Sequence, residues 1–263
     1  ARAALHHWEE PPISGSRGSG TIFFSGCSLG CVFCQNEEIS HRDFGKAVSL
    51  ERLVQICDEL IAQGAHNINF VNPTHFSHAV RTLLIRHPLP VPVVWNSGGY
   101  DRVETLRALK GLVDVYLPDL KYRSPERGAR YSHAPDYFAV ARPGIEAMMA
   151  QAGHPVFDAD GILQKGVILR HLALPGHVKD SFAVLDQMAA WNDADPGCFL
   201  PSVMSQYTPF YKAAEHGIGR RITTYEYRRV VNYAMDLGLS SGYMQQKSSA
   251  KEEYTPSFDL TGV

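Results

Sequence analysis

Apolar, strand-like runs alternate with amphipathic helical patterns along most of this chain, and this alternation restricts its fold more than any other feature. It is typical of repeated βα units around a parallel sheet. Six runs predict strands: Thr21–Phe24, Asn67–Val71, Val91–Trp95, Val113–Leu117, Gly166–Leu174 and Cys198–Val203. A closed eight-stranded barrel needs two more units, and the stretch from Gly238 to Val263 holds neither. We therefore expect one α/β domain whose parallel barrel is incomplete.

Helical periodicity fills most of the gaps between these runs. The predicted helices cover Ser49–Gly64, a stretch ending near Arg86, Asp101–Lys110, Ile145–Ala152, Asp180–Trp191 and Thr223–Gly238. Thr223 and Glu226 have the spacing of a capping box. The segment Tyr122–Tyr137 is rich in Arg, Ser, Gly and Pro and is predicted to be a loop. We expect it at the active-site end, contacting a large acidic substrate, with a solvated connector as the alternative.

Length and charge limit the classes of partner. With 263 residues and a formal net charge of −2, the chain suits one large core and gives no reason to expect nucleic acid or an anionic membrane as a partner. No run approaches the roughly 18 apolar residues of a membrane helix. The five cysteines are an odd number, and Ala1–Pro12 lacks a signal pattern. These features predict a cytoplasmic protein.

Three of the cysteines follow the first predicted strand directly. Cys27, Cys31 and Cys34 are separated by three and then two residues. Three thiolates on one short loop can each take one corner of a 4Fe–4S cubane, which leaves the fourth iron open to another ligand. Gly26 and Gly30 allow the loop to turn tightly around such a cluster. The spacing therefore predicts an iron–sulfur site.

A structural zinc site is the alternative for these cysteines. Zinc takes four ligands, usually as two spaced pairs. The other two cysteines, Cys57 and Cys198, stand alone in apolar helix and strand patterns, where a free cysteine behaves as a small hydrophobic residue. We predict that neither binds metal.

The cysteine motif, with Phe33 before its third cysteine, resembles that of the radical S-adenosylmethionine (SAM) superfamily. More narrowly, the chain is similar to uncharacterised paralogues of pyruvate formate-lyase activating enzyme. The closer similarity rests on five segments: His7–Pro11 (HWEEP), Gly18–Gly20 (GSG), Asn72–His75 (NPTH), Pro118–Lys121 (PDLK) and Met204–Tyr207 (MSQY).

The resemblance implies a single-domain partial (β/α)6 barrel of parallel strands with SAM bound across its top. It also implies an oxidoreductase in which reduced flavodoxin or ferredoxin supplies one electron, SAM is cleaved at the 4Fe–4S cluster, and a 5′-deoxyadenosyl radical abstracts a hydrogen from the substrate. Activation of a glycyl-radical enzyme is the activity implied first. Modification of a peptide or small molecule is an alternative, although the chain has too few further cysteines for an auxiliary cluster. A metal-stabilised binding protein without catalysis is the third hypothesis.

Polar side chains after the second and third predicted strands are candidates for contacting SAM, since parallel barrels carry their sites at the carboxyl ends of the strands. Asn72, Thr74 and His75 stand where the resemblance implies Gly-Gly-Glu, and they offer oxygen and nitrogen acceptors instead. Thr74 is also suited to cap a helix, and the two roles are compatible. Asn96 or Ser97 is expected to contact the ribose or carboxylate of SAM, although a strand-to-helix turn explains both residues as well.

The later strands supply charged candidates. The resemblance implies that Asp119 helps to bind a monovalent cation beside SAM and that Lys121 reaches the SAM carboxylate; a surface ion pair is the alternative. Arg170 lies in an apolar strand and needs an anion, which is either the SAM carboxylate or a partner in a buried salt bridge. Met204 is expected to pack against the adenine or to belong to the core.

The chain ends are assigned by exclusion from the barrel pattern. Residues 1–20 are expected to form an extension packed on the barrel, with Trp8 across its open side. Residues 21–240 are expected to form the barrel, and residues 241–263 a tail.

Overall fold

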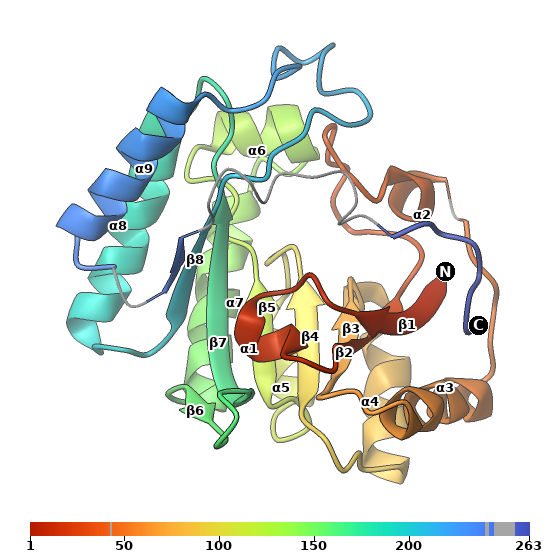
Figure 1. Ribbon diagram of the computed structural model, residues 1–263. Coiled ribbons are helices and arrows are strands. Elements are labelled where there is room, and N and C mark those ends of the chain that lie inside the picture. The colour runs from red at the N-terminus through yellow and green to blue at the C-terminus, as the bar shows by residue number, and fades with distance from the viewer. Residues whose placement is uncertain (43, 240–241, 245–255) are drawn as a thin grey trace.

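The computed structural model describes residues 1–42, 44–239, 242–244 and 256–263 (Figure 1). Six successive parallel strands form the centre of the sheet: β2 (Ser19–Phe23), β3 (Ile68–Val71), β4 (Val93–Ser97), β5 (Val115–Pro118), β7 (Leu163–Leu172) and β8 (Leu200–Met204). They are hydrogen-bonded neighbours in that order. The six predicted strands are confirmed, with shifted ends.

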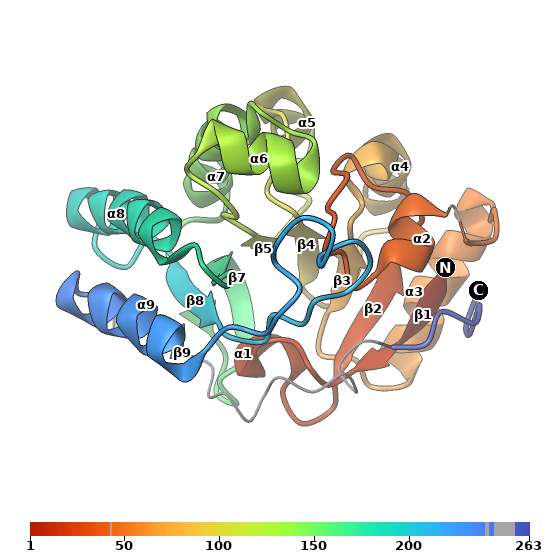
Figure 2. The same cartoon turned by 90° about the horizontal axis from the view of Figure 1, so that it is seen from above.

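Further strands complete the two edges of the sheet. β1 (Arg2–His6) pairs antiparallel with β2, and β9 (Tyr243–Met244) pairs parallel with β8. Within the described residues β1 and β9 do not pair with each other, and the view from above shows these two edges apart (Figure 2). The fold is thus a single α/β domain with a partial barrel, as expected. Among the described residues after Gly238, β9 is the one element that joins the sheet, and this two-residue strand is too short for periodicity to reveal.

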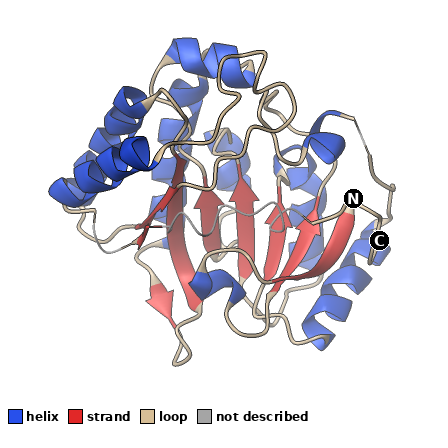
Figure 3. Cartoon of the chain, turned by 45° about the horizontal axis from the view of Figure 1, so that its top comes forward, coloured by secondary structure: helices blue, strands red, loops and turns tan. Residues whose placement is uncertain are grey.

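Helices cover the outer face of the sheet (Figures 2 and 3). They are α3 (Leu50–Ala62), α4 (Ser77–Arg86), α5 (Val103–Ala108), α7 (Tyr137–Ala152), α8 (Val178–Ala194) and α9 (Thr224–Asp236). Shorter elements are α1 (Pro11–Ser14), α2 (Glu37–His41), the 3-10 turn η1 (Thr74–Phe76) and the strand β6 (Val156–Phe157). The capping box of Thr223 and Glu226 is confirmed, since each side chain accepts a hydrogen bond from the backbone of the other residue.

The loop predicted over Tyr122–Tyr137 is instead largely helical. It contains α6 (Pro125–Ser132) and the first residue of α7. Ser124 caps α6 by accepting a hydrogen bond from the Arg127 backbone, and Pro125 stands at the first helical position, where its missing N–H costs nothing. Local capping therefore overrides a composition that favours loops.

Helix α7 starts at Tyr137, eight residues before the predicted start at Ile145. The prediction placed the start too late because Pro143 and Gly144 are typical of a helix boundary. Both residues lie inside the helix. A Cβ on Gly144 would stand 2.7 Å from the carbonyl oxygen of Asp101, so the glycine permits a close approach between helix and chain.

The N-terminal residues fill part of the barrel interior. Ile13 of α1 is fully buried among inward-facing strand residues, namely Val94, Val115, Leu117, Leu163 and Ile168. Trp8, which was expected across the open side, lines the cavity at the strand ends and remains 59% exposed. The N-terminal extension therefore packs into the barrel interior through the side chain of Ile13.

The last described residues return to the opposite edge of the sheet from β9. The Ala3 amide donates to the carbonyl oxygen of Thr261 at 2.9 Å, and Arg2 forms an ion pair with Asp259 at 2.9 Å. Figure 1 shows both chain ends beside β1. Among the described residues, no helix is long and apolar enough to cross a membrane.

Candidate functional site: a cysteine-lined cavity at the carboxyl ends of the strands

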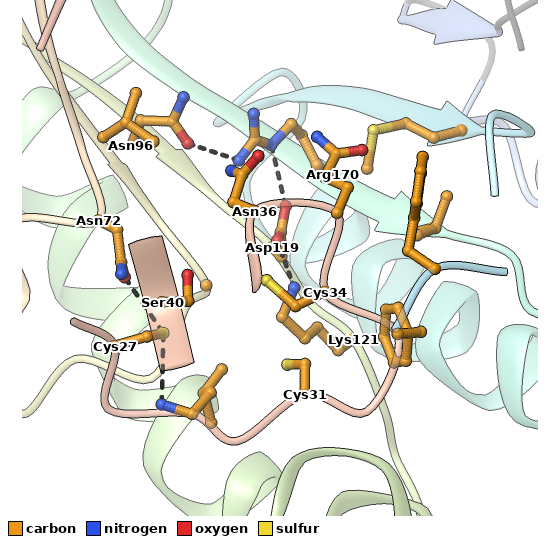
Figure 4. Close-up of a pocket in the computed structure, with 18 of the residues that line it drawn as sticks. Cys27, Cys31, Cys34, Asn36, Ser40, Asn72, Asn96, Asp119, Lys121 and Arg170 are labelled. Carbon is orange, nitrogen blue, oxygen red and sulfur yellow. Dashed lines mark hydrogen bonds and ion pairs between the residues drawn. The ribbon is translucent and has the colours of Figure 1, made fainter. Parts of the chain in front are cut away.

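A cavity of about 270 Å³ opens where the parallel strands end (Figure 4). All three clustered cysteines line it. Seven of the nine predicted SAM-contacting residues line it as well: Asn72, Asn96, Ser97, Asp119, Lys121, Arg170 and Met204. They come from the ends of five strands or from the residues that follow, which is where a parallel barrel positions its site.

The cysteine loop is held by backbone hydrogen bonds and by a residue from the next strand. The Gly26 amide donates to the carbonyl oxygen of Ile39 at 2.7 Å. Asn72 Nδ2 donates to the carbonyl oxygen of Gly26 at 2.5 Å, and Asn72 Oδ1 lies 3.4 Å from the Cys27 sulfur. Gly26 has a φ of 83°, a left-handed conformation that favours glycine. The end of β3 thus fixes the start of the loop.

The three thiols share one cavity, whereas Cys57 and Cys198 lie buried in the core. Burial raises the pKa of the Cys31 thiol to about 12 and also raises the pKa of Cys34. At neutral pH these two thiols therefore stay protonated unless a bound metal stabilises the thiolate. Binding of a metal at Cys31 and Cys34 must release their protons.

The donor set fits a cluster better than a single ion. In the parts of the chain that the structure describes, no three His, Cys, Asp or Glu side chains are grouped so that one metal ion could be held. A cubane places each thiolate on a different iron, so its three ligands need not converge on one point. Cys27, Cys31 and Cys34 would hold three irons of such a cluster.

A network of charged side chains forms the wall beside the cysteines. The Asp119 carboxylate accepts from Lys121 Nζ at 2.5 Å and from Arg170 Nε at 2.9 Å. Arg170 also donates to Asn96 Oδ1 at 2.7 Å and lies 3.5 Å from the Glu9 carboxylate. The buried salt bridge considered for Arg170 is therefore present within the protein itself.

Charge and burial compete across this network. Burial alone would raise the pKa of Asp119, but the cations of Lys121 and Arg170 hold it below its ordinary value. Burial alone would lower the pKa of Lys121, but the Asp119 carboxylate raises it on balance. Burial raises the pKa of both Glu9 and Glu10, against the opposing effect of Arg170. The two basic groups thus remain charged at neutral pH.

Two predicted contacts, Thr74 and His75, do not line the cavity. The Thr74 hydroxyl donates to Asp101 Oδ1 at 2.7 Å, and His75 Nε2 lies 2.6 Å from the carbonyl oxygen of Ser25. The 3-10 turn after β3 directs both side chains away from the cavity. The hydroxyl of Ser97, which does line the cavity, also donates to Asp101. The hydroxyls of Thr74 and Ser97 therefore both donate hydrogen bonds to the buried carboxylate of Asp101.

The monovalent cation expected beside Asp119 stays a prediction. Both oxygens of Asp119 accept from cationic side chains, and each oxygen retains a second lone pair.

The segment Tyr122–Tyr137 does lie at the cysteine end of the barrel, since Tyr122 lines the cavity and the Gly30 amide donates to the carbonyl oxygen of Ser132. Two of its arginines do not line the cavity: Arg123 stacks on Phe138 and Arg127 Nε donates to His177. Its contact with a large substrate stays a prediction.

Sequence reasoning missed two kinds of site residue. Glu9 reaches the cavity and pairs with Arg170, which is 161 positions away, so no local pattern reveals the contact. Asn36 lines the cavity two residues after Cys34, and its Oδ1 is buried with no hydrogen-bond partner among the described residues. Its place beside the motif was a signal that could have been used.

Comparison with known proteins agrees with this geometry. Residues 21–157 match the radical SAM superfamily model. The chain belongs to the radical SAM superfamily. It is 33% identical over 248 residues to an uncharacterised protein of the archaeon Methanocaldococcus jannaschii, covering 91% of this chain and 68% of that relative.

Two solved structures share the fold. HydG, a maturase of the FeFe-hydrogenase, has a TM-score of 0.58 at 13% identity and covers 89% of this chain. Methylornithine synthase, PylB, has a TM-score of 0.50 at 15% identity and covers 82%. The chain spans only 53% and 62% of those two proteins. The superfamily implies a 4Fe–4S cluster and SAM, which favours the cluster over zinc at the three cysteines.

Proposed function

We propose that this protein is a radical SAM enzyme that binds its cluster through Cys27, Cys31 and Cys34 and cleaves SAM reductively in the cavity beside them. The observation that carries the proposal is the placement of three thiols and a charged wall around one cavity. The cluster, when bound, supplies the electron for cleavage of SAM to methionine and a 5′-deoxyadenosyl radical. The chain itself orients SAM and shields the reactive group from water.

The charged wall is the proposed site for the amino-acid part of SAM. Within the described residues Lys121 Nζ makes one ion pair, with Asp119, so it has two further N–H groups for a ligand carboxylate. Arg170 is engaged by Asp119, Asn96 and Glu9. Lys121 is therefore the better direct contact, and Arg170 holds the wall in place. Leu172, Leu174 and Met204 form an apolar side suited to the adenine.

Replacing Lys121 by Met should raise the dissociation constant for SAM by roughly 10- to 100-fold, because a hydrogen bond to a charged group contributes about 1.5–3 kcal/mol. Equilibrium binding of SAM to the cluster-loaded protein measures this effect. Lys110→Met is a matched control, since Lys110 is exposed and lies outside the cavity. Equal affinities in the two variants would remove Lys121 from the SAM site.

We propose activation of a glycyl-radical enzyme as the first activity to test, with reduced flavodoxin or ferredoxin as electron donor. The support is the resemblance of the HWEEP, PDLK and MSQY segments, whose Glu9, Asp119, Lys121, Met204 and Gln206 all line the cavity. A peptide or small molecule is the alternative source of the abstracted hydrogen.

Anaerobic reconstitution with iron and sulfide, followed by SAM and a strong reductant, tests the proposed chemistry. We expect 5′-deoxyadenosine and methionine in equal amounts, and neither from the zinc-loaded protein. A fully loaded 4Fe–4S protein that forms no 5′-deoxyadenosine would contradict the function. Appearance of a glycyl-radical signal in an added partner enzyme would then distinguish activation from the other substrate classes.

A further inference from the structure

Two buried hydroxyl groups form a hydrogen-bonded chain that ends at the sulfur of Cys31, the middle cysteine of the motif. Ser132, the last residue of α6, places its hydroxyl oxygen 3.0 Å from the Cys31 sulfur. The Tyr122 hydroxyl lies 2.9 Å from the same serine oxygen. Ser132 and Tyr122 are each 1% exposed and Cys31 is 8% exposed, so bulk water does not compete for these contacts.

The backbone fixes this arrangement on both sides of Cys31. The Gly30 amide donates to the carbonyl oxygen of Ser132 at 3.1 Å, and the Val32 amide donates to the carbonyl oxygen of Tyr131 at 2.9 Å. A Cβ on Gly30 would stand 2.8 Å from the ring of His133, so the loop and the end of α6 are in close contact. These backbone contacts between the cysteine loop and the end of α6 thus hold the Ser132 hydroxyl close to the Cys31 sulfur.

Ionisation of Cys31 sets the direction of both hydrogen bonds. A thiolate has no proton to donate, so the Ser132 hydroxyl must donate to the sulfur. The serine oxygen then accepts from the Tyr122 hydroxyl. Both O–H dipoles point toward the sulfur, and in a buried site such a chain stabilises negative charge there.

We propose that Ser132, oriented by Tyr122, is a positioning residue that raises the reduction potential of the cluster bound at Cys31. The proposal rests on the proposed function. Reduction adds one electron, supplied by an external low-potential reductant, and the sulfur ligands become more negative. A hydrogen bond donated to one of them is therefore stronger in the reduced state than in the oxidised state.

Spectroelectrochemical titration of the reconstituted protein, followed by electron paramagnetic resonance (EPR), tests this proposal. In Ser132→Ala we expect the ratio of reduced to oxidised cluster at a fixed potential to fall about tenfold, a shift of about 59 mV to more negative values for one electron. Tyr122→Phe, which keeps the serine hydroxyl but removes its orienting donor, should shift the potential in the same direction by less. Ser132→Thr, which retains a hydroxyl, should stay near the wild-type value.

Ser181→Ala is the matched control, because Ser181 is equally buried but hydrogen-bonds to His171 instead of a cysteine. If Ser132→Ala holds a full cluster with the same potential as this control, the proposal is wrong, while the proposed function still stands. If Ser132→Ala cannot hold a cluster, Tyr122→Phe decides, and an unshifted potential there overturns the proposal. Failure of the wild-type protein to assemble any cluster would instead reject the proposed function itself.

Discussion

The Cys31→Ser variant is expected to lose nearly all of its iron after anaerobic reconstitution. In the proposed site each of the three thiolates would hold a different iron, and the two ligands left in the variant would be too few to retain a cubane with an open fourth corner. Wild-type protein should bind about four irons per chain, and the variant less than about one. Iron and sulfide analysis, together with the visible absorbance of the cluster, measures the difference.

Cys57→Ala is the control for this experiment. Cys57 is fully buried on α3, belongs to the hydrophobic core and does not line the cavity. It should therefore keep the wild-type iron content, even though the variant loses some core packing. A retained cluster in Cys31→Ser, or a lost one in Cys57→Ala, would refute the assignment of ligands.

Replacing Arg170 by Met should lower the free energy of unfolding by about 3–5 kcal/mol, because removing one member of a buried ion network leaves its partners uncompensated. The side chains of Arg170 and Glu9 are each 12% exposed, and that of Asp119 is 17% exposed. Urea denaturation of both proteins in the same cluster-free state measures the loss. Arg142→Met is the control, since its ion pair with Glu146 is exposed and should contribute less than about 1 kcal/mol.

The difference in free energy of unfolding between wild-type protein and Arg170→Met should also depend on pH. The pKa of Asp119 lies below its ordinary value because of Lys121 and Arg170, so its contribution to wild-type stability is present above the unfolded pKa and is lost as the pH falls through the folded pKa. The pKa of Glu9 is raised by burial, and without Arg170 it would rise further. The gap between variant and wild type should therefore narrow on acidification, first as the pH falls through the raised pKa of Glu9 and then as it falls through the lowered pKa of Asp119. A gap that widens on acidification would contradict this account of the network.

Much of the fold could be predicted because buried parallel strands and amphipathic helices have clear periodicities. The predicted runs ending at Val71, Trp95 and Leu117 form β3, β4 and β5, which are successive neighbours in the sheet, as the βα pattern indicates. The antiparallel strand Arg2–His6 and the two-residue strand at Tyr243 are specified by pairing with distant residues. Helix α6 was missed because its Ser124 cap lies in a segment whose Arg, Ser, Gly and Pro content is typical of a loop.

The candidate site was predictable where residue type and topology agree. The cysteine spacing identified the loop, and the rule that sites lie at strand ends identified Asp119, Lys121 and Arg170 as neighbours. The same rule failed at Thr74 and His75, because the turn after β3 directs their side chains elsewhere. Sequence could not show that Glu9 is a second protein anion for Arg170, because Glu9 comes from the distant N-terminal extension.

Low-temperature EPR spectroscopy of the reduced, reconstituted protein, before and after addition of SAM, tests the central claim most directly. If Cys27, Cys31 and Cys34 hold a 4Fe–4S cluster with one open iron, the amino and carboxylate groups of SAM should bind that iron and change the spectrum. The account predicts a 4Fe–4S signal whose g-values shift when SAM is added. A full cluster whose spectrum is unchanged by saturating SAM would contradict it.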